Sequence, residues 1–142
     1  MSIQKIDVAY TAVATAENGR DGRVSTNDGK LDVVVNPPKE MGGSGDGTNP
    51  EQLFAAGYSA CFQGALGVVA RAAKADIAGS TVTAQVGIGK TEAGGFGLEV
   101  ELVASIPSVD RATAEELVAK AHEVCPYSNA TRGNIKVTLT VA

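Results

Sequence analysis

The stretch of sequence that decides the fold is NPEQLFAAGYSACFQGALGVVARAAK, residues 49–74. Asn49 is a favoured N-cap residue, Pro50 suits the first helical position, and Glu51 complements the positive end of a helix dipole. From residue 52 to residue 70 no side chain is charged. These signals predict a long helix from residue 50 to about residue 74, around which the other elements must be arranged.

The predicted helix is rich in small residues. Four of them recur at three- and four-residue steps and so share one face: Gly57, Ala60, Gly64 and Gly67. Glycine in a helix interior costs about 1 kcal/mol relative to alanine, so this stripe predicts the close approach of a second backbone. The uncharged run is close to membrane-spanning length, but its glutamines, serine and glycines favour a buried helix of a soluble protein.

Composition limits the chemistry that is available. The chain has 142 residues, two cysteines, one histidine and a formal net charge of −4. A single imidazole excludes a multi-histidine metal site, and without a cluster of Lys and Arg we expect no nucleic-acid partner. Asp7 lies where the apolar core of a secretory signal would begin, so a cytoplasmic protein is predicted, in a compartment that keeps thiols reduced. The length fits a single domain over residues 1–142.

The other segments predict an α+β fold with antiparallel sheets. Runs of β-favouring residues between turn residues predict strands, and helical spacing after Asp110 predicts a second helix, which Pro126 ends. The strands cluster between the helices instead of alternating with them, which is typical of α+β proteins. The predicted strands cover residues 6–14, a hairpin over 23–35 around 27–29, 82–88, 96–106 and 135–141, with turns at 17–22 and 92–95 and a flexible surface loop at 42–47.

The two cysteines, Cys61 in the middle of the first helix and Cys125 at the end of the second, allow two interpretations. Free cysteines are often small buried hydrophobes, which would make both inert. Alternatively, Cys61 borders Gly57 and Gly64, an arrangement that a packing role does not need. At an ordinary pKa of about 8.5 only a few per cent of a thiol is ionised at pH 7, so a reactive Cys61 needs a positive neighbour.

Three further residues are candidates for a site around Cys61. Arg20 lies in a glycine-flanked turn, from which its side chain can be aimed at a thiolate. Glu51 is a candidate carboxylate to hold that arginine, and equally a first-turn acid that the helix dipole favours. His122 is either a base near Cys125 or an exposed residue near a helix C-terminus, where its charge is tolerated.

The segments around both cysteines resemble the Ohr/OsmC family. Residues 49–62, NPEQLFAAGYSACF, look like the first cysteine motif of that family. Residues 124–134, VCPYSNATRGN, resemble the second motif in the form typical of the Ohr branch. Residues 19–22, GRDG, resemble the segment that carries the active-site arginine of the family. The similarity extends over essentially the whole chain in length and in the order of elements.

This resemblance implies an OsmC/Ohr-like fold, in which a long central helix carries Cys61 and two copies form an intertwined homodimer with two active sites at the interface. It implies a thiol peroxidase that reduces organic hydroperoxides, including those of fatty acids, to alcohols. Cys61 would be the peroxidatic and Cys125 the resolving cysteine, joined in turnover by a disulfide. Arg20 would stabilise the Cys61 thiolate and Glu51 would hold Arg20. The implied reductant is a lipoyl-type dithiol, supplied by a lipoylated protein, with no bound cofactor or metal.

Helix geometry sharpens this expectation. Glu51 precedes Cys61 by ten residues, or about 15 Å along a helix axis. We therefore predict that Arg20 bridges the two and that the Arg20–Glu51 pair serving one Cys61 comes from the other subunit. The residues predicted to line an alkyl-chain pocket are Phe54, Tyr58, Phe62 and Phe96. The alternatives are a peroxidase of the OsmC branch with a different substrate preference, and a non-catalytic redox-sensing dimer.

Overall fold

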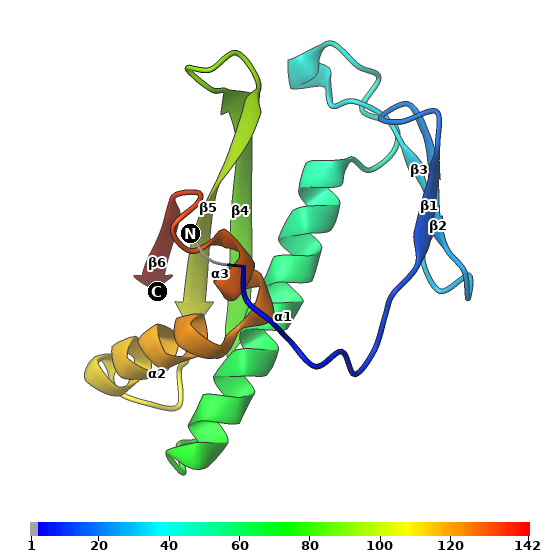
Figure 1. Ribbon diagram of the computed structural model, residues 1–142. Helices are drawn as coiled ribbons and strands as arrows, with labels where there is room; N and C mark the ends of the chain where they lie inside the picture. Colours follow the sequence, from blue (N-terminus) through cyan, green and yellow to red (C-terminus); the bar gives the residue numbers. More distant parts are fainter. Residues whose placement is uncertain (1–2) are drawn as a thin grey trace. The chain divides into compact units, whose positions relative to one another are not determined.

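The computed structural model describes residues 3–142 and divides into two compact units, Met1–Pro50 and Glu51–Ala142. Each unit contains a three-stranded sheet, and the second also contains nearly all of the helical residues (Figure 1). This combination confirms the predicted α+β class. The prediction of one domain over residues 1–142 stays a prediction.

The first unit is built on an antiparallel sheet of order β1-β2-β3. Its strands are β1 (Ala14–Glu17), β2 (Gly22–Thr26) and β3 (Asp32–Val35). The predicted turn between β1 and β2 is confirmed: Asn18 and Gly19 have φ of 58° and 57°, the left-handed conformation that Asn and Gly adopt most readily. The predicted hairpin around residues 27–29 joins β2 to β3 and is also confirmed.

The strand predicted over residues 6–14 is wrong in its position. Pairing begins only at Ala14, and the described residues before it lie in no strand. The physical reason is the lack of a partner, because β2 is already matched along its length by residues 14–17 on one side and by β3 on the other. The alternating apolar residues Ile6, Val8 and Tyr10 are therefore left 77%, 63% and 80% exposed.

The glycine-rich segment predicted as a surface loop is held by backbone hydrogen bonds. It follows the short 3-10 helix η1 (Lys39–Met41), and the amides of Gly43 and Gly45 donate to the carbonyls of Pro38 and Pro37. Gly43 must be glycine here, because a Cβ would lie 2.1 Å from the Pro37 carbonyl oxygen. The loop thus returns the chain to β3, beside which Thr48 pairs with Val35.

The second unit begins with the long helix α1 (Pro50–Ala72), which ends close to the predicted position. The strands β4 (Thr81–Lys90) and β5 (Phe96–Ser105) form the predicted antiparallel hairpin. The predicted second helix is α2 (Arg111–Val124), whose N-cap Asp110 accepts a hydrogen bond from the Thr113 amide. The unit ends with α3 (Pro126–Thr131), a short helix that was not predicted, and β6 (Val137–Val141).

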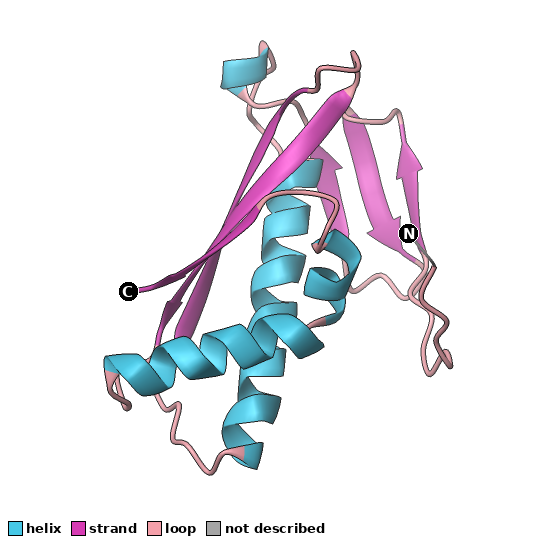
Figure 2. Ribbon diagram, turned by 60° about the vertical axis from the view of Figure 1, so that its left-hand side comes forward, coloured by secondary structure: helices cyan, strands magenta, loops and turns pink. Residues whose placement is uncertain are grey.

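The β4-β5-β6 sheet differs from the expected antiparallel arrangement in one pairing. β6 pairs with β5 in the parallel direction, because α2 and α3 carry the chain back to the start of β5 before it enters the sheet. The three helices lie on one face of this sheet (Figure 2). Alternate residues of β5, among them Val100, Leu102 and Ala104, are buried on that side, whereas Glu99 and Glu101 point to the opposite face.

Helix α1 supplies one wall of the core. It buries Tyr58, Phe62, Ala65, Leu66 and Ala70. By length and composition, with a mean hydropathy of 1.5, it is apolar enough to cross a membrane, a property that core helices share. The predicted close approach of a backbone along its small-residue stripe is not found within the described chain: a Cβ at Gly64 or at Gly67 would meet no atom within 4 Å.

Candidate active site

The two sulfurs lie side by side in the second unit. Cys125 Sγ donates a hydrogen bond to Cys61 Sγ at 3.5 Å, and both cysteines are free thiols. Residues that are 64 positions apart in the chain thus meet, as the resemblance to the family implied. Cys61 is partly buried in the middle of α1, whereas Cys125 has no exposed surface.

Local sequence explains how Cys125 reaches α1. Cys125 ends α2 and begins α3, with extended φ and ψ of −64° and 124°. This conformation follows from Pro126, because the proline ring disfavours helical geometry in the preceding residue and its own fixed φ suits the first position of a new helix. Arg132 stabilises the junction between α2 and α3. Its guanidinium donates to the carbonyl of His122 at the end of α2 and to Asn129 Oδ1.

The surroundings of Cys61 act on its thiol in opposite directions. Burial raises the pKa of Cys61 and is the largest effect, and the neighbouring Cys125 sulfur acts in the same direction. The backbone amide of Tyr127 donates a hydrogen bond to the Cys61 sulfur and lowers that pKa, because it favours the thiolate. The net shift is upward, so the thiolate needs a further source of stabilisation.

Three aromatic rings, two from α1 and one from α3, pack against one another. The rings of Phe54 and Tyr58 and those of Phe54 and Tyr127 contact edge to face, with centroids 6.1 Å apart in each pair, and Tyr58 and Tyr127 are 5.6 Å apart. Gly57 makes room for this packing, since a Cβ there would lie 2.6 Å from Tyr127 Oη. One glycine of the stripe thus admits a side chain from α3.

A buried set of hydroxyl groups connects α1 to α3. Tyr58 Oη is 2.8 Å from Ser128 Oγ and 3.0 Å from Thr131 Oγ1, and His122 Nδ1 is 2.8 Å from the same Ser128 oxygen. His122 is therefore neither a base in hydrogen-bond contact with Cys125 nor a fully exposed residue. Burial lowers the pKa of His122, and the Arg132 guanidinium acts in the same direction.

The remaining predicted site residues are distributed over both units. Arg20 lies in the exposed turn between β1 and β2, and Glu51 lies in the first turn of α1. They belong to different units, so their predicted meeting with Cys61 stays a prediction. Phe62 is fully buried in the core, and Phe96 is 69% exposed at the start of β5. Their place in a substrate pocket likewise stays a prediction.

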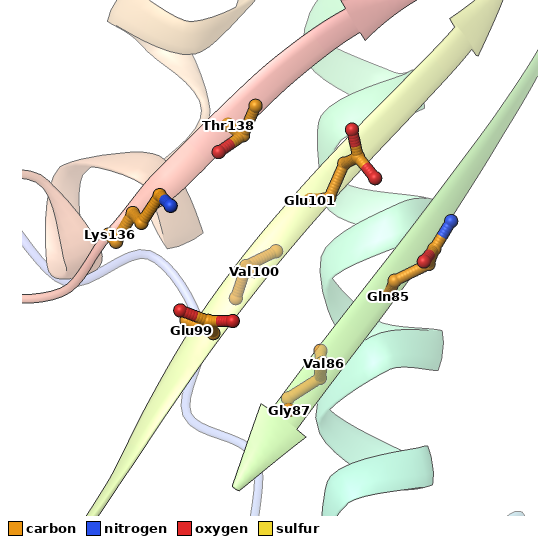
Figure 3. A pocket seen from close by; sticks show the side chains of 8 residues that line it. All are labelled: Gln85, Val86, Gly87, Glu99, Val100, Glu101, Lys136 and Thr138. Atoms are coloured by element: carbon orange, nitrogen blue, oxygen red, sulfur yellow. The ribbon is translucent and has the colours of Figure 1, made fainter.

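No metal site competes with this thiol pair in the part of the chain that the structure describes, where no three His, Cys, Asp or Glu side chains gather. A hollow of about 500 Å³ lies instead on the sheet face that α1 does not cover (Figure 3). Its rim carries mixed polar groups from β4, β5 and the β6 region, namely Gln85, Glu99, Glu101, Lys136 and Thr138. Because it contains neither sulfur, it is separate from the thiol site.

The chain matches known proteins both in sequence and in fold. The family model described as OsmC-like protein matches residues 43–140, which include both cysteines. The chain belongs to this family. Its curated relatives confirm the predicted Ohr branch. The organic hydroperoxide resistance protein of Xanthomonas axonopodis pv. citri (strain 306) is 56% identical over 137 residues, covering 95% of this chain and 96% of that protein.

Two further relatives support the assignment to the OsmC-like family. Organic hydroperoxide resistance protein OhrB of Bacillus subtilis (strain 168) is 49% identical over 92% of this chain and 96% of that protein. The crystal structure of an organic hydroperoxide resistance protein from Elizabethkingia anophelis matches with a TM-score of 0.92 at 56% identity, over 96% of this chain and 99% of that chain. The predicted OsmC/Ohr-like fold is therefore confirmed.

Four residues of this OsmC-like site lie within the 124–134 motif but received no role of their own from the sequence: Tyr127, Ser128, Thr131 and Arg132. The start of α3 had a local signal, because proline is typical of the first position of a helix and Pro126 occupies it. The burial of Ser128 and Thr131 had no such signal, because both are polar residues that most often lie on the surface.

Proposed function

We propose that this protein is a thiol-dependent peroxidase that reduces organic hydroperoxides, of alkyl and fatty-acid type, to alcohols through Cys61 and Cys125. The observation that carries the proposal is the 3.5 Å separation of two free sulfurs in a chain of the Ohr branch. A disulfide bond is about 2.05 Å long, so the pair can close with a movement of about 1.5 Å. The relatives named for organic hydroperoxide resistance support this role.

The chemistry requires only the two sulfurs and a dithiol. The Cys61 thiolate attacks one peroxide oxygen, the O–O bond breaks, and the alkoxide takes a proton to leave as the alcohol, which makes Cys61 a sulfenic acid. The Cys125 thiol then attacks the Cys61 sulfur, the S–S bond forms, and the hydroxyl leaves as water with the proton of Cys125. A lipoyl-type dithiol, carried by a lipoylated protein, reduces the disulfide through exchange.

The raised pKa of Cys61 means that its thiolate needs a nearby positive charge, which we propose that Arg20 supplies. Since burial opposes ionisation, a nearby guanidinium would favour the thiolate and the charge that develops on the leaving oxygen. We assign this part to Arg20 and assign Glu51 to hold it, because a carboxylate can pair with a guanidinium through two hydrogen bonds. Phe54, Tyr58, Phe62 and Phe96 are the proposed lining for an alkyl chain.

The working form that we propose is a cytoplasmic homodimer. The exposed alternating residues Ile6, Val8 and Tyr10 form an unpaired strand-like segment, which a second copy can cover. The open positions at Gly64 and Gly67 on α1 also allow another backbone to approach closely. In this assembly the Arg20–Glu51 pair of one subunit would serve Cys61 of the other.

The experiment that tests the function is turnover with defined reagents. Wild-type protein with dihydrolipoamide should consume many equivalents of tert-butyl hydroperoxide, whereas Cys61→Ser should consume none above the background. Wild-type activity in Cys61→Ser would rule out the mechanism. Oxidation of the wild type by a single equivalent, with no further consumption, would instead favour the redox-sensing module.

A further inference from the structure

The hydroxyl groups beneath Cys125 form a continuous buried chain of hydrogen bonds. It runs from His122 Nδ1 through Ser128 Oγ and Tyr58 Oη to Thr131 Oγ1, with separations of 2.8, 2.8 and 3.0 Å. Ser128 and Tyr58 have no exposed surface, and Thr131 is 5% exposed. Because these three hydroxyl groups are buried, each depends on its neighbours for its hydrogen bonds.

Counting protons gives the chain a direction. Thr131 Oγ1 donates to the Ser128 carbonyl at 3.3 Å, so it accepts from Tyr58 Oη. The tyrosine then has no second proton, so Ser128 Oγ must donate to it. Ser128 in turn accepts from His122, which requires a proton on Nδ1. This direction assigns neutral His122 to the tautomer that carries its proton on Nδ1 and none on Nε2.

This series of hydrogen-bonded hydroxyl groups joins the two helices that carry the sulfurs. Ser128 follows Cys125 by three residues on α3, and Tyr58 precedes Cys61 by three residues on α1. We propose that Ser128, Tyr58 and His122 are positioning residues, which hold Cys125 Sγ against Cys61 Sγ through this one-directional chain and so speed disulfide formation. The proposal rests on the proposed function, because it concerns the second chemical step of that cycle.

Positioning through this chain has a specific consequence for the two steps. Peroxide reduction takes place at the Cys61 sulfur, which none of these hydrogen bonds involves. Disulfide formation needs a thiol to travel about 1.5 Å along one line, and a displacement of about 1 Å can cost about a hundredfold in rate. Loss of these hydrogen bonds should therefore slow disulfide formation and leave the rate of peroxide reduction unchanged.

The kinetic test uses single turnover with one equivalent of tert-butyl hydroperoxide, followed by acid quenching and mass spectrometry. Ser128→Ala should consume peroxide at the wild-type rate but form the Cys61–Cys125 disulfide about tenfold to a hundredfold more slowly. Dimedone should then trap the accumulated Cys61 sulfenic acid. Tyr58→Phe, which removes the hydroxyl that α1 contributes, should slow disulfide formation to a similar extent, and only this rate is compared for it because Tyr58 also belongs to the proposed alkyl-chain lining. The matched control is Ser59→Ala, because that hydroxyl donates to the Ala56 carbonyl and lies outside the chain.

A double variant distinguishes positioning from general weakening of the fold. Because Ser128 and Tyr58 act in one chain, Tyr58→Phe/Ser128→Ala should be no slower than the slower single variant. Additive losses, or an unchanged disulfide rate in both single variants, would overturn the proposal and leave the proposed function intact. A wild type that forms no disulfide would overturn both.

The direction of the chain can be measured without any variant. His122 is the only histidine, so ¹⁵N-labelled protein gives a single pair of ring nitrogens whose shifts report the tautomer. At pH 8 we expect protonated Nδ1, and we expect Ser128→Ala to shift the population toward protonated Nε2. Protonated Nε2 in the wild type would overturn the assigned direction. This result does not depend on peroxidase activity, so it separates failure of the chain from failure of the function.

Discussion

Cys61 and Cys125 are the same chemical group in two different environments. Cys61 lies within an unbroken helix, is partly exposed, and receives a hydrogen bond from the Tyr127 amide. Cys125 lies at the junction of two helices, is fully buried, and donates its own thiol proton to Cys61. One cysteine is thus partly exposed to solvent, whereas the other is enclosed beside its partner.

This difference teaches how a protein can divide a two-step reaction between identical side chains. Exposure decides which sulfur meets the peroxide, and burial protects the second sulfur from oxidation before it is needed. The helix junction keeps Cys125 close, and the hydroxyl chain beneath it connects the junction to α1. The roles therefore follow from placement, and each of the following experiments alters one side of the comparison.

The largest expected effect is a difference in alkylation. In the reduced protein iodoacetamide should label Cys61 about a hundredfold faster than Cys125, because labelling of a fully buried thiol waits for local opening. Peptide mass spectrometry over a time course measures both rates. In denaturant the two rates should become equal, which is the control. Equal rates in the folded protein would contradict the division of roles.

The next effect concerns the charge that Cys61 needs. Arg20→Ala should raise the pKa of Cys61 further and slow its alkylation at pH 7 by about tenfold, which corresponds to one pKa unit. The matched control is Arg23→Ala, since Arg23 is an exposed arginine nearby in the chain that pairs with Asp32. The measurement is the pH profile of iodoacetamide labelling. An identical profile for wild type and Arg20→Ala would remove Arg20 from the site.

The parts of this fold that the sequence predicted are those with local causes. Asn49, Pro50 and Glu51 set the start of α1, and Pro126 ended α2 in the extended conformation that turns Cys125 inward. Neither inference needed knowledge of any other element. The same holds for the turn at Asn18 and Gly19, whose backbone conformation depends on the residues themselves.

What could not be predicted depends on distant partners. The direction of β6 is decided by where two helices return the chain, and a short helix such as α3 offers too few turns for a periodic signal. The hydroxyl chain joins Tyr58 to residues about 70 positions away, and no local pattern marks such a contact. The segment over 6–14 has the residues of a strand but lacks a partner in this chain.

A smaller effect distinguishes two glycines on either side of Cys61. Gly57→Ala should lower the free energy of unfolding by about 1 kcal/mol, because the new methyl group meets Tyr127 Oη and overpacking outweighs the gain in helix propensity. Denaturant titration measures this loss. It should be independent of protein concentration, since Tyr127 belongs to the same chain.

Gly64→Ala is the matched comparison, because its methyl group would meet no atom of the described residues within 4 Å. As we propose that a second copy covers this face, the expected result is a weaker dimer, by about 1 kcal/mol in association free energy. Sedimentation over a range of concentrations checks it. A variant that is more stable than the wild type, with unchanged association, would show that this part of α1 stays uncovered.

The smallest expected effect is the contribution of His122, near Cys125, to the pH dependence of the free energy of unfolding. Burial and the Arg132 guanidinium lower the pKa of His122 from its ordinary 6.5, so the unfolded chain binds the proton more readily than the folded one. The resulting stability is fully present above pH 6.5 and is lost as the pH falls through the lower pKa of the folded state. His122→Gln should flatten this part of the profile of unfolding free energy against pH. A wild-type NMR titration with a midpoint above 6.5 would reverse the sign, and stability would then be lost on the alkaline side instead.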